Sequence, residues 1–188
     1  MKDSGEKLKG ELLAAIPSLR AFAMSLSGKP DRADDLVQET LLKAWGNLAS
    51  YTEGTNLRAW LFTILRNVFY SQYRRRKREV EDADGLMAGN LSSEPEQNGH
   101  MDFEDFKLAL QRLPPDQREA LILVGASGMS YEEAAEICQC AVGTVKSRVN
   151  RARGKLAELL GFEVAPEFHG QLDRPFPHNL AVLGAAFE

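Results

Sequence analysis

Residues 130–156 read SYEEAAEICQCAVGTVKSRVNRARGKL, and this stretch predicts two short helices joined by a tight turn. Ser130 and Glu133 have the spacing of a capping box, in which each side chain bonds the other residue's backbone N–H at the start of a helix. The apolar residues that follow recur in steps of three and four, which places them on one buried stripe of each helix. The stretch therefore has the pattern of a helix-turn-helix.

The second of these helices has a basic face opposite its apolar stripe. No Asp or Glu occurs from Ala141 to Ala157, whereas Lys and Arg recur throughout. A charged face is usually only solvated, but such faces normally mix both signs. The turn and the acid-free helix together therefore favour DNA binding. The basic residues of this face are Lys146, Arg148, Arg151, Arg153 and Lys155.

Helical spacing of apolar residues also predicts three helices in the first part of the chain. The first runs from Leu8 to Leu26, and Pro17 should kink or restart it. Asp31 is placed to cap the second helix, whose inward residues include Trp45. Asn56 is placed to cap a long third helix that reaches about Arg78.

The charge pattern separates two helical parts of the chain. Residues 79–105 contain many acids, Gly and Ser but no Lys or Arg, a composition that cannot bury a core. We therefore expect an all-α fold of two small helical domains, at 8–79 and 103–161, joined by a flexible acidic linker at 80–102. Residues 162–188 have no clear period and predict an irregular tail.

Composition and motifs exclude several classes of protein. The net charge of −4 hides segregated basic blocks, and no apolar run is long enough to span a membrane or to serve as a signal peptide, so we expect a cytoplasmic protein. Cys138 and Cys140 have no second pair, which predicts small packed residues and not a zinc site. No catalytic motif is present, so neither an enzyme, a metal nor a cofactor is expected.

Four motifs occur in order, and together they are specific. They are DDLVQETLLKAW at 34–45, NLRAWLFTILRN at 56–67, LPPDQREALIL at 113–123, and GMSYEEAAEI followed by GTVKSRVNRARGKL near the end. Over residues 8–161 the chain resembles the extracytoplasmic-function (ECF) sigma factors of bacterial RNA polymerase. The first domain is similar to sigma region 2 and the second to region 4. The stretch from 113 to 137 resembles the general-stress-response (EcfG-like) branch.

This resemblance implies three groups of site residues. Docking on the clamp helices of the polymerase largest subunit is implied for Asp34, Asp35, Gln38 and Glu39. Contact with the minus-10 promoter element is implied for Tyr51, Asn56, Arg58, Arg74, Arg75 and Arg76. Contact with the minus-35 element is implied for Thr144, Lys146, Ser147, Arg148, Arg151 and Arg153. Without the resemblance, the acids near residue 34 would equally suit a first helical turn that complements the helix dipole.

The resemblance also implies the partners: core RNA polymerase through its clamp helices and flap, promoter DNA, and a small anti-sigma protein. Two other functions compete with this interpretation. A sigma-mimicking anti-anti-sigma protein would also need a receiver domain, and it would not need a basic recognition helix. An operator-binding helix-turn-helix regulator would leave the DDLVQET and WLFTILRN motifs without a role.

Overall fold

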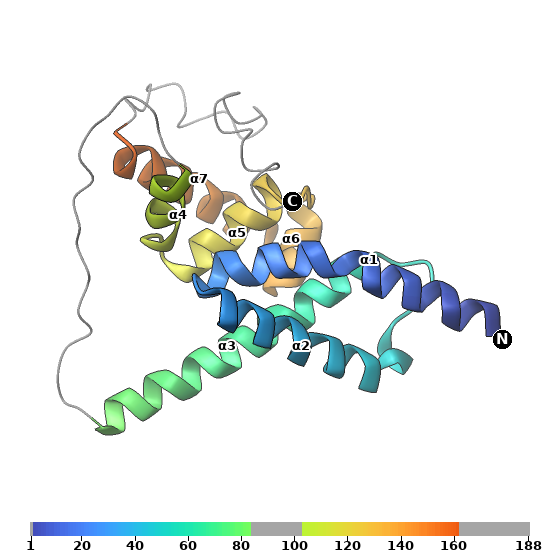
Figure 1. The fold of residues 1–188 in the computed structure, drawn as a ribbon. Coiled ribbons are helices and arrows are strands. Elements are labelled where there is room, and N and C mark those ends of the chain that lie inside the picture. Colours follow the sequence, from blue (N-terminus) through green and yellow to red (C-terminus); the bar gives the residue numbers. More distant parts are fainter. Residues whose placement is uncertain (1, 84–102, 162–188) are drawn as a thin grey trace.

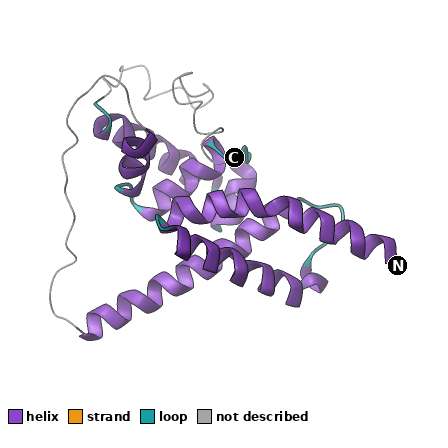
Figure 2. Cartoon of the chain, viewed as in Figure 1, coloured by secondary structure: helices purple, strands orange, loops and turns teal. Residues whose placement is uncertain are grey.

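The computed structural model of the chain describes residues 2–83 and 103–161, and all regular elements in these two ranges are helices (Figures 1 and 2). In chain order they are α1 (Lys2–Ser27), α2 (Pro30–Gly46), the 3-10 helix η1 (Leu48–Ser50), α3 (Leu57–Ala83), α4 (Phe103–Gln111), α5 (Pro115–Gly125), α6 (Tyr131–Cys138) and α7 (Val142–Leu159). The expected all-α fold is confirmed. The expected tail, and residues 84–102 of the expected linker, lie outside the described residues.

Helices α1, α2 and α3 form the first module and pack pairwise against one another. Helix α1 neither ends nor restarts at Pro17. It ends at Ser27, and the next residue, Gly28, has a positive φ of 69°, a conformation that glycine adopts without strain. Helix α2 starts at Pro30, two residues earlier than a cap at Asp31 would place it, because proline suits a first helical position that has no use for its N–H. Asp31 therefore lies in the first turn and does not cap the helix.

The buried face of α2 includes Thr40, which was not predicted, and excludes Trp45, which was. Its buried residues are Ala33, Leu36, Val37, Thr40 and Ala44. Thr40 belongs to this stripe because its hydroxyl donates to the carbonyl oxygen of Leu36 at 2.6 Å, which satisfies the only polar group of its side chain. Trp45 follows Ala44 and is turned away from the core, with 62% of its surface exposed. The prediction that Trp45 points inward is wrong.

Helices α4 to α7 form the second module, and the predicted helix-turn-helix is α6 and α7. The predicted capping box is present: the N–H of Glu133 donates to Ser130 Oγ at 3.0 Å, and the N–H of Ser130 donates to Glu133 Oε2 at 2.8 Å. Gln139 takes a left-handed conformation (φ 53°) at the turn. Helix α7 begins after Ala141, whose side chain cannot cap it.

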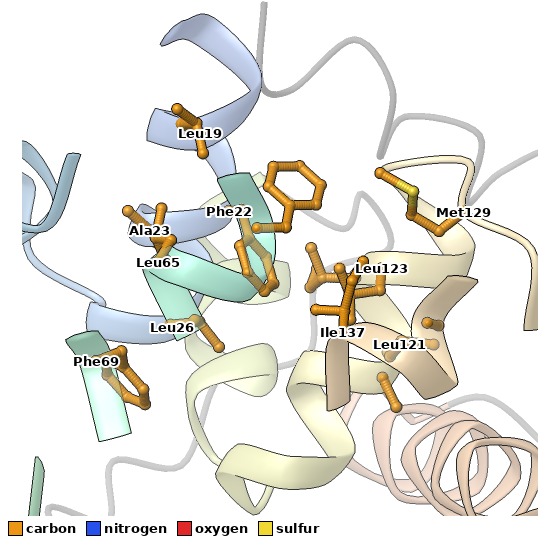
Figure 3. Packing of buried hydrophobic residues seen from close by; sticks show 14 of the residues in the cluster. Leu19, Phe22, Ala23, Leu26, Leu65, Phe69, Leu121, Leu123, Met129 and Ile137 are labelled. Atoms are coloured by element: carbon orange, nitrogen blue, oxygen red, sulfur yellow. The ribbon is translucent and has the colours of Figure 1, made fainter. Parts of the chain in front are cut away.

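The two modules pack against each other and share one hydrophobic core. Helix α1 contacts α4 and α5, and α3 contacts α6. Figure 3 shows Phe22 of α1 facing Leu123 of α5 and Ile137 of α6, and Leu65 of α3 beside Ala23 of α1. The far half of α3 projects away from this body and extends to Ala83, beyond the expected domain end at 79 (Figure 1).

Candidate polymerase-docking and DNA-binding surfaces

Of the four residues of α2 predicted to dock on polymerase, two bond to other side chains of the protein and two are exposed to solvent. Asp34 accepts two bonds from Arg20, at 2.7 and 3.1 Å, and Glu39 pairs with Lys43 at 3.0 Å and accepts from Gln72 at 2.8 Å. The bond from Lys43 is the main cause of the lowered pKa of Glu39. Asp35 and Gln38 are exposed, so their oxygens face solvent.

Helical spacing puts two apolar residues in line with Asp35 and Gln38. Leu42 and Trp45 follow in steps of four and three, and 75% and 62% of their surfaces are exposed. We call these four residues the docking stripe: Asp35, Gln38, Leu42 and Trp45. Sequence reasoning missed its apolar half because it assigned Trp45 to the core. Adjacent exposed Leu and Trp side chains are typical of protein–protein contact surfaces.

The residues predicted to contact the minus-10 element lie in the loop before α3 and in its first turn. Tyr51 is half-buried, with its ring centroid 5.3 Å from that of Trp60 and its hydroxyl donating to the Thr55 carbonyl at 2.9 Å. Asn56 caps α3 as predicted, because its Oδ1 accepts from the N–H of Ala59 at 3.1 Å. The Tyr51 ring is therefore already packed against Trp60.

Asn56 and Arg58 also bond to the second module. Asn56 Nδ2 donates to Glu133 Oε1 at 2.7 Å, and Arg58 donates to the carbonyl oxygen of Ser127. The sequence separates these partners by more than sixty positions, so no local pattern indicated the contacts.

The predicted basic cluster occupies the projecting half of α3. Arg74 and Arg75 are exposed, and Arg76 is half-buried and bonds to Gln72 at 3.3 Å. A row of guanidinium groups on a projecting helix suits contact with the phosphates of a duplex, which gives affinity without sequence information.

The exposed face of α7 carries part of the predicted minus-35 group. Thr144, Ser147 and Arg151 are exposed and follow helical spacing on one face. Lys146 lies over the ring of Tyr131, 5.5 Å from its centroid. These positions start at the N-terminal end of the helix, the end that enters the major groove in helix-turn-helix proteins.

Two other predicted members of this group are less exposed. Arg148 is half-buried, with its Nε 3.1 Å from a carboxylate oxygen of Asp116 and its NH1 3.7 Å from the sulfur of Cys140. Arg153 is also half-buried. A side chain that reads bases has to extend into the groove. The predicted DNA contact of Arg148 therefore requires that its ion pair with Asp116 breaks.

The cysteines pack near the turn as expected. Cys138 is buried, and burial raises the pKa of its thiol to about 12, so the thiolate that metals and oxidants require does not form near neutral pH. Within residues 2–83 and 103–161, no cluster of three His, Cys, Asp or Glu side chains could hold a metal ion. None of the helices that the structure describes is long and apolar enough to cross a bilayer.

Sequence reasoning missed a buried polar cluster between the modules. Glu119 and Arg118 are 0% and 6% exposed, although both are charged. Glu119 lies 2.8 Å from Arg66 Nε, and the Tyr70 hydroxyl donates to it at 3.2 Å. Two consecutive charges within the apolar helix pattern of LPPDQREALIL were the available signal, because such residues are buried only when paired.

Comparison with known proteins agrees with this two-module architecture. Residues 13–79 match the family model of sigma-70 region 2, and residues 103–156 match that of sigma-70 region 4. The chain therefore carries, in the same order, the two regions that define the sigma-70 class of transcription initiation proteins.

Individual relatives show to which group of this class the chain belongs. The ECF RNA polymerase sigma factor EcfG of Rhodopseudomonas palustris (strain TIE-1) is 66% identical over 163 residues, which cover 87% of this chain and 90% of that protein. The ECF sigma factor SigC of Mycobacterium tuberculosis is 34% identical and covers 82% of this chain and 84% of its own length. The chain belongs to the ECF RNA polymerase sigma factors, and the predicted similarity to EcfG is confirmed.

A solved structure shows the same architecture. The sigma factor RpoE from Bartonella quintana, crystallised in complex with the anti-sigma factor NepR, has a TM-score of 0.74 and 58% sequence identity to this chain. The match covers 85% of this chain and 99% of RpoE.

Proposed function

We propose that this chain binds core RNA polymerase through α2 and directs it to promoters that its two modules read at the minus-10 and minus-35 elements. The observation that carries the proposal is the presence, on one chain 66% identical to EcfG, of sigma regions 2 and 4 with their exposed polar and basic faces. Each module alone would contact only one element. Joined on one chain, the two modules select a promoter by both elements.

The docking stripe is the proposed contact with the clamp helices of the polymerase largest subunit. Asp35 and Gln38 offer exposed oxygens that can accept bonds from Arg or Lys of a partner helix. Leu42 and Trp45 offer apolar surface beside them that a partner would bury. Large side chains buried in this way carry most of the binding energy of an interface. The second module is the proposed contact with the flap.

Promoter contacts are proposed for the two DNA-facing groups. Asn56 and Arg58 have donors for bases and phosphates of the opened minus-10 strand, and Arg74 to Arg76 suit the adjacent duplex. Thr144, Ser147 and Arg151 form the exposed part of the minus-35 surface.

Run-off transcription with purified core polymerase tests the proposal. Adding the chain should produce a promoter-specific transcript from a stress-response promoter of the source cell, whereas the chain alone should bind the same DNA weakly. Absence of both core binding and initiation would refute the sigma-factor function.

A charge reversal on the docking stripe tests where polymerase binds. Asp35→Arg should weaken core binding about tenfold or more, because a like charge placed against a basic partner helix costs several kcal/mol. Glu11→Arg, the same reversal at an exposed position of α1, should leave the affinity unchanged. Equal affinities of the two variants would remove Asp35 from the docking surface.

We further propose that a small anti-sigma protein holds this chain inactive until a stress signal arrives. Support comes from RpoE, the 58% identical sigma factor solved with NepR. A tagged chain should capture a small protein from unstressed cells and lose it after stress. An anti-anti-sigma mimic would capture the same protein but would not support transcription, and an operator-binding regulator would bind DNA without polymerase.

A further inference from the structure

Arg148 lies at the edge of the exposed face of α7, where this helix packs against α5. Three other predicted DNA contacts of the helix are exposed and follow one another in steps of three and four: Thr144, Ser147 and Arg151. Arg148 lies about 100° further around the helix axis than Ser147, and only 23% of its side chain is exposed. Its side chain is therefore largely covered by protein before any DNA binds.

The guanidinium of Arg148 joins two other parts of the second module. Its Nε lies 3.1 Å from Oδ2 of Asp116 on α5, and its Nη1 donates to the sulfur of Cys140 at 3.7 Å. Cys140 lies in the turn between α6 and α7. One side chain thus connects the recognition helix both to α5 and to the turn that precedes it.

The local sequence stabilises this turn weakly. Gln139 has a left-handed conformation, with φ 53°, which a residue with a side chain adopts less readily than glycine. Ala141 has no side-chain oxygen to accept from the first N–H groups of α7. The contact with Arg148 therefore supports a turn that lacks both a glycine and a cap.

Lys146 holds α7 on the other side of its exposed face. Its ammonium group lies over the ring of Tyr131, the first residue of α6, at 5.5 Å from the centroid. Lys146 and Arg148 thus anchor α7 to α6 and to α5. The three exposed residues of the helix lie between these two anchors.

The geometry of the Arg148 contacts opposes a second role in base reading. A bidentate contact with guanine uses two nitrogens on one edge of a guanidinium, and it discriminates between bases roughly 5- to 150-fold. Two of the three nitrogens of Arg148 already have partners in Asp116 and Cys140. Reading a base in this way therefore competes with at least one of the two contacts.

The ion pair contributes more to orientation than to stability. Of the Asp116 side chain, 45% is exposed, so water screens the attraction between the two charges. Recognition of bases, in contrast, depends on how the whole helix sits in the major groove. A contact that contributes little to folding can thus matter for the angle at which α7 presents its exposed residues.

We propose that Arg148 is a positioning residue of the minus-35 surface, which fixes the orientation of α7 through Asp116 and the turn and does not itself read a base. Base reading then falls to Thr144, Ser147 and Arg151. The DNA-reading part rests on the proposed function, whereas the support of the turn in the free chain does not.

The sign of the effect of Asp116→Asn separates positioning from base reading. The measurement is a competition for the complex of the chain with core polymerase, between two promoter duplexes that differ only in a native or a scrambled minus-35 element. If Arg148 positions α7, Asp116→Asn should lower the preference for the native element at least threefold. If Arg148 reads a base, loss of its protein partner would free it, and an unchanged or higher preference would overturn the proposal.

A matched control removes the effect of the charge itself. Asp105→Asn makes the same change on α4 and should keep the wild-type preference, because neutralising an acid near DNA strengthens binding to both duplexes alike. A loss in Asp105→Asn equal to that in Asp116→Asn would mean that the ion pair with Arg148 is not the cause.

A double-mutant cycle in the same competition tests whether Arg148 acts through Asp116. Arg148→Ala should lower the preference at least as much as Asp116→Asn. The double variant should be no worse than Arg148→Ala alone, because both substitutions remove the same pair. A double variant whose loss equals the product of the two single losses would overturn positioning through Asp116.

Amide hydrogen exchange of the free full chain, followed by NMR, tests the support of the turn without DNA. The N–H groups of Thr144 and Val145 bond to the Ala141 carbonyl at 2.8 and 3.2 Å. Arg148→Ala should speed their exchange at least threefold, whereas Arg151→Ala should lower the minus-35 preference and leave this exchange unchanged.

Asp116→Asn should speed the same exchange in the same direction, and far-UV circular dichroism should show wild-type helicity in every variant. Unchanged exchange in both Arg148→Ala and Asp116→Asn would overturn the support of the turn. A wild-type complex without any preference for the native element would count against the proposed function alone, because the exchange result is obtained without DNA or polymerase.

Discussion

Trp45 is a large apolar side chain that is mostly exposed to water and is not part of the hydrophobic core. Truncating it should hardly affect folding but should remove the largest apolar group of the docking stripe. We predict that Trp45→Ala changes the free energy of unfolding by less than about 0.5 kcal/mol and weakens core polymerase binding by about 2 kcal/mol, as for an interface hot spot.

Leu108→Ala is the matched control for Trp45, since Leu108 is also exposed but lies on α4. Urea unfolding and a titration with core polymerase measure the two effects. A loss of stability as large as the loss of affinity would mean that Trp45 supports the fold.

Glu119 links stability to pH because its environment changes on folding. Burial raises the pKa of Glu119 above its ordinary value of 4.5, although the charge of Arg66 lowers it in part. The folded chain thus holds this proton more tightly than the unfolded chain. The stabilisation from Glu119 is complete below about pH 4.5 and is lost as the pH rises through the raised pKa.

Glu119→Gln keeps the shape of the protonated side chain at every pH. We predict that its free energy of unfolding, relative to wild type, increases as the pH rises from 4.5 towards 7, in urea titrations at several pH values. A difference that does not vary with pH would show that Glu119 titrates alike in the folded and unfolded chains.

At the scale of elements, the capping box of α6 has a local and a long-range role. Ser130→Ala removes the hydroxyl that accepts from the N–H of Glu133, and we predict a loss of about 1 kcal/mol in the free energy of unfolding. Ser71→Ala, at an exposed position inside α3, should change it by less than about 0.5 kcal/mol. Equal urea midpoints for the two variants would show that the cap contributes nothing measurable.

The sequence predicted those elements that depend on local patterns. Spacing of apolar residues located the helices, and the capping box located α6, because both signals involve residues within one or two turns. The face of α2 was misjudged where a polar residue, Thr40, completes the buried stripe by bonding to its own helix. A hydroxyl satisfied in this way cannot be distinguished in sequence from an exposed one.

The candidate site was predictable only in part. The exposed oxygens of the docking stripe and the basic face of α7 follow from residue type and helical period. The partners of Asn56, Arg58 and Arg148 do not, because each lies in another element and is brought near by packing. Glu119 shows the same limit: a charge within an apolar pattern predicts a partner, but not that the partner is Arg66.

For the whole molecule, the docking stripe is exposed while the second module packs against the first, which implies an order of events in polymerase binding. A contact through the stripe leaves this packing intact, whereas a contact that needs the modules apart has to break the pair of Arg66 with Glu119. Binding to the whole core then combines two contacts. The stripe is always accessible, whereas the apparent affinity of the second contact is reduced because only some chains have their modules apart. A substitution that weakens the packing between the modules, such as Arg66→Gln, should therefore affect only the second contact.

This difference can be measured with two forms of polymerase. Arg66→Gln should bind an isolated clamp-helix coiled coil within twofold of wild type, because the docking stripe is unchanged. The same variant should bind complete core polymerase severalfold more tightly than wild type or than Arg112→Gln, the same charge change at an exposed position, because the second module no longer has to detach first. Equal affinity of all three proteins for complete core would mean that opening costs nothing in the free chain. Tighter binding to the isolated coiled coil would mean that Arg66 acts on the docking surface and not only on the packing between the modules.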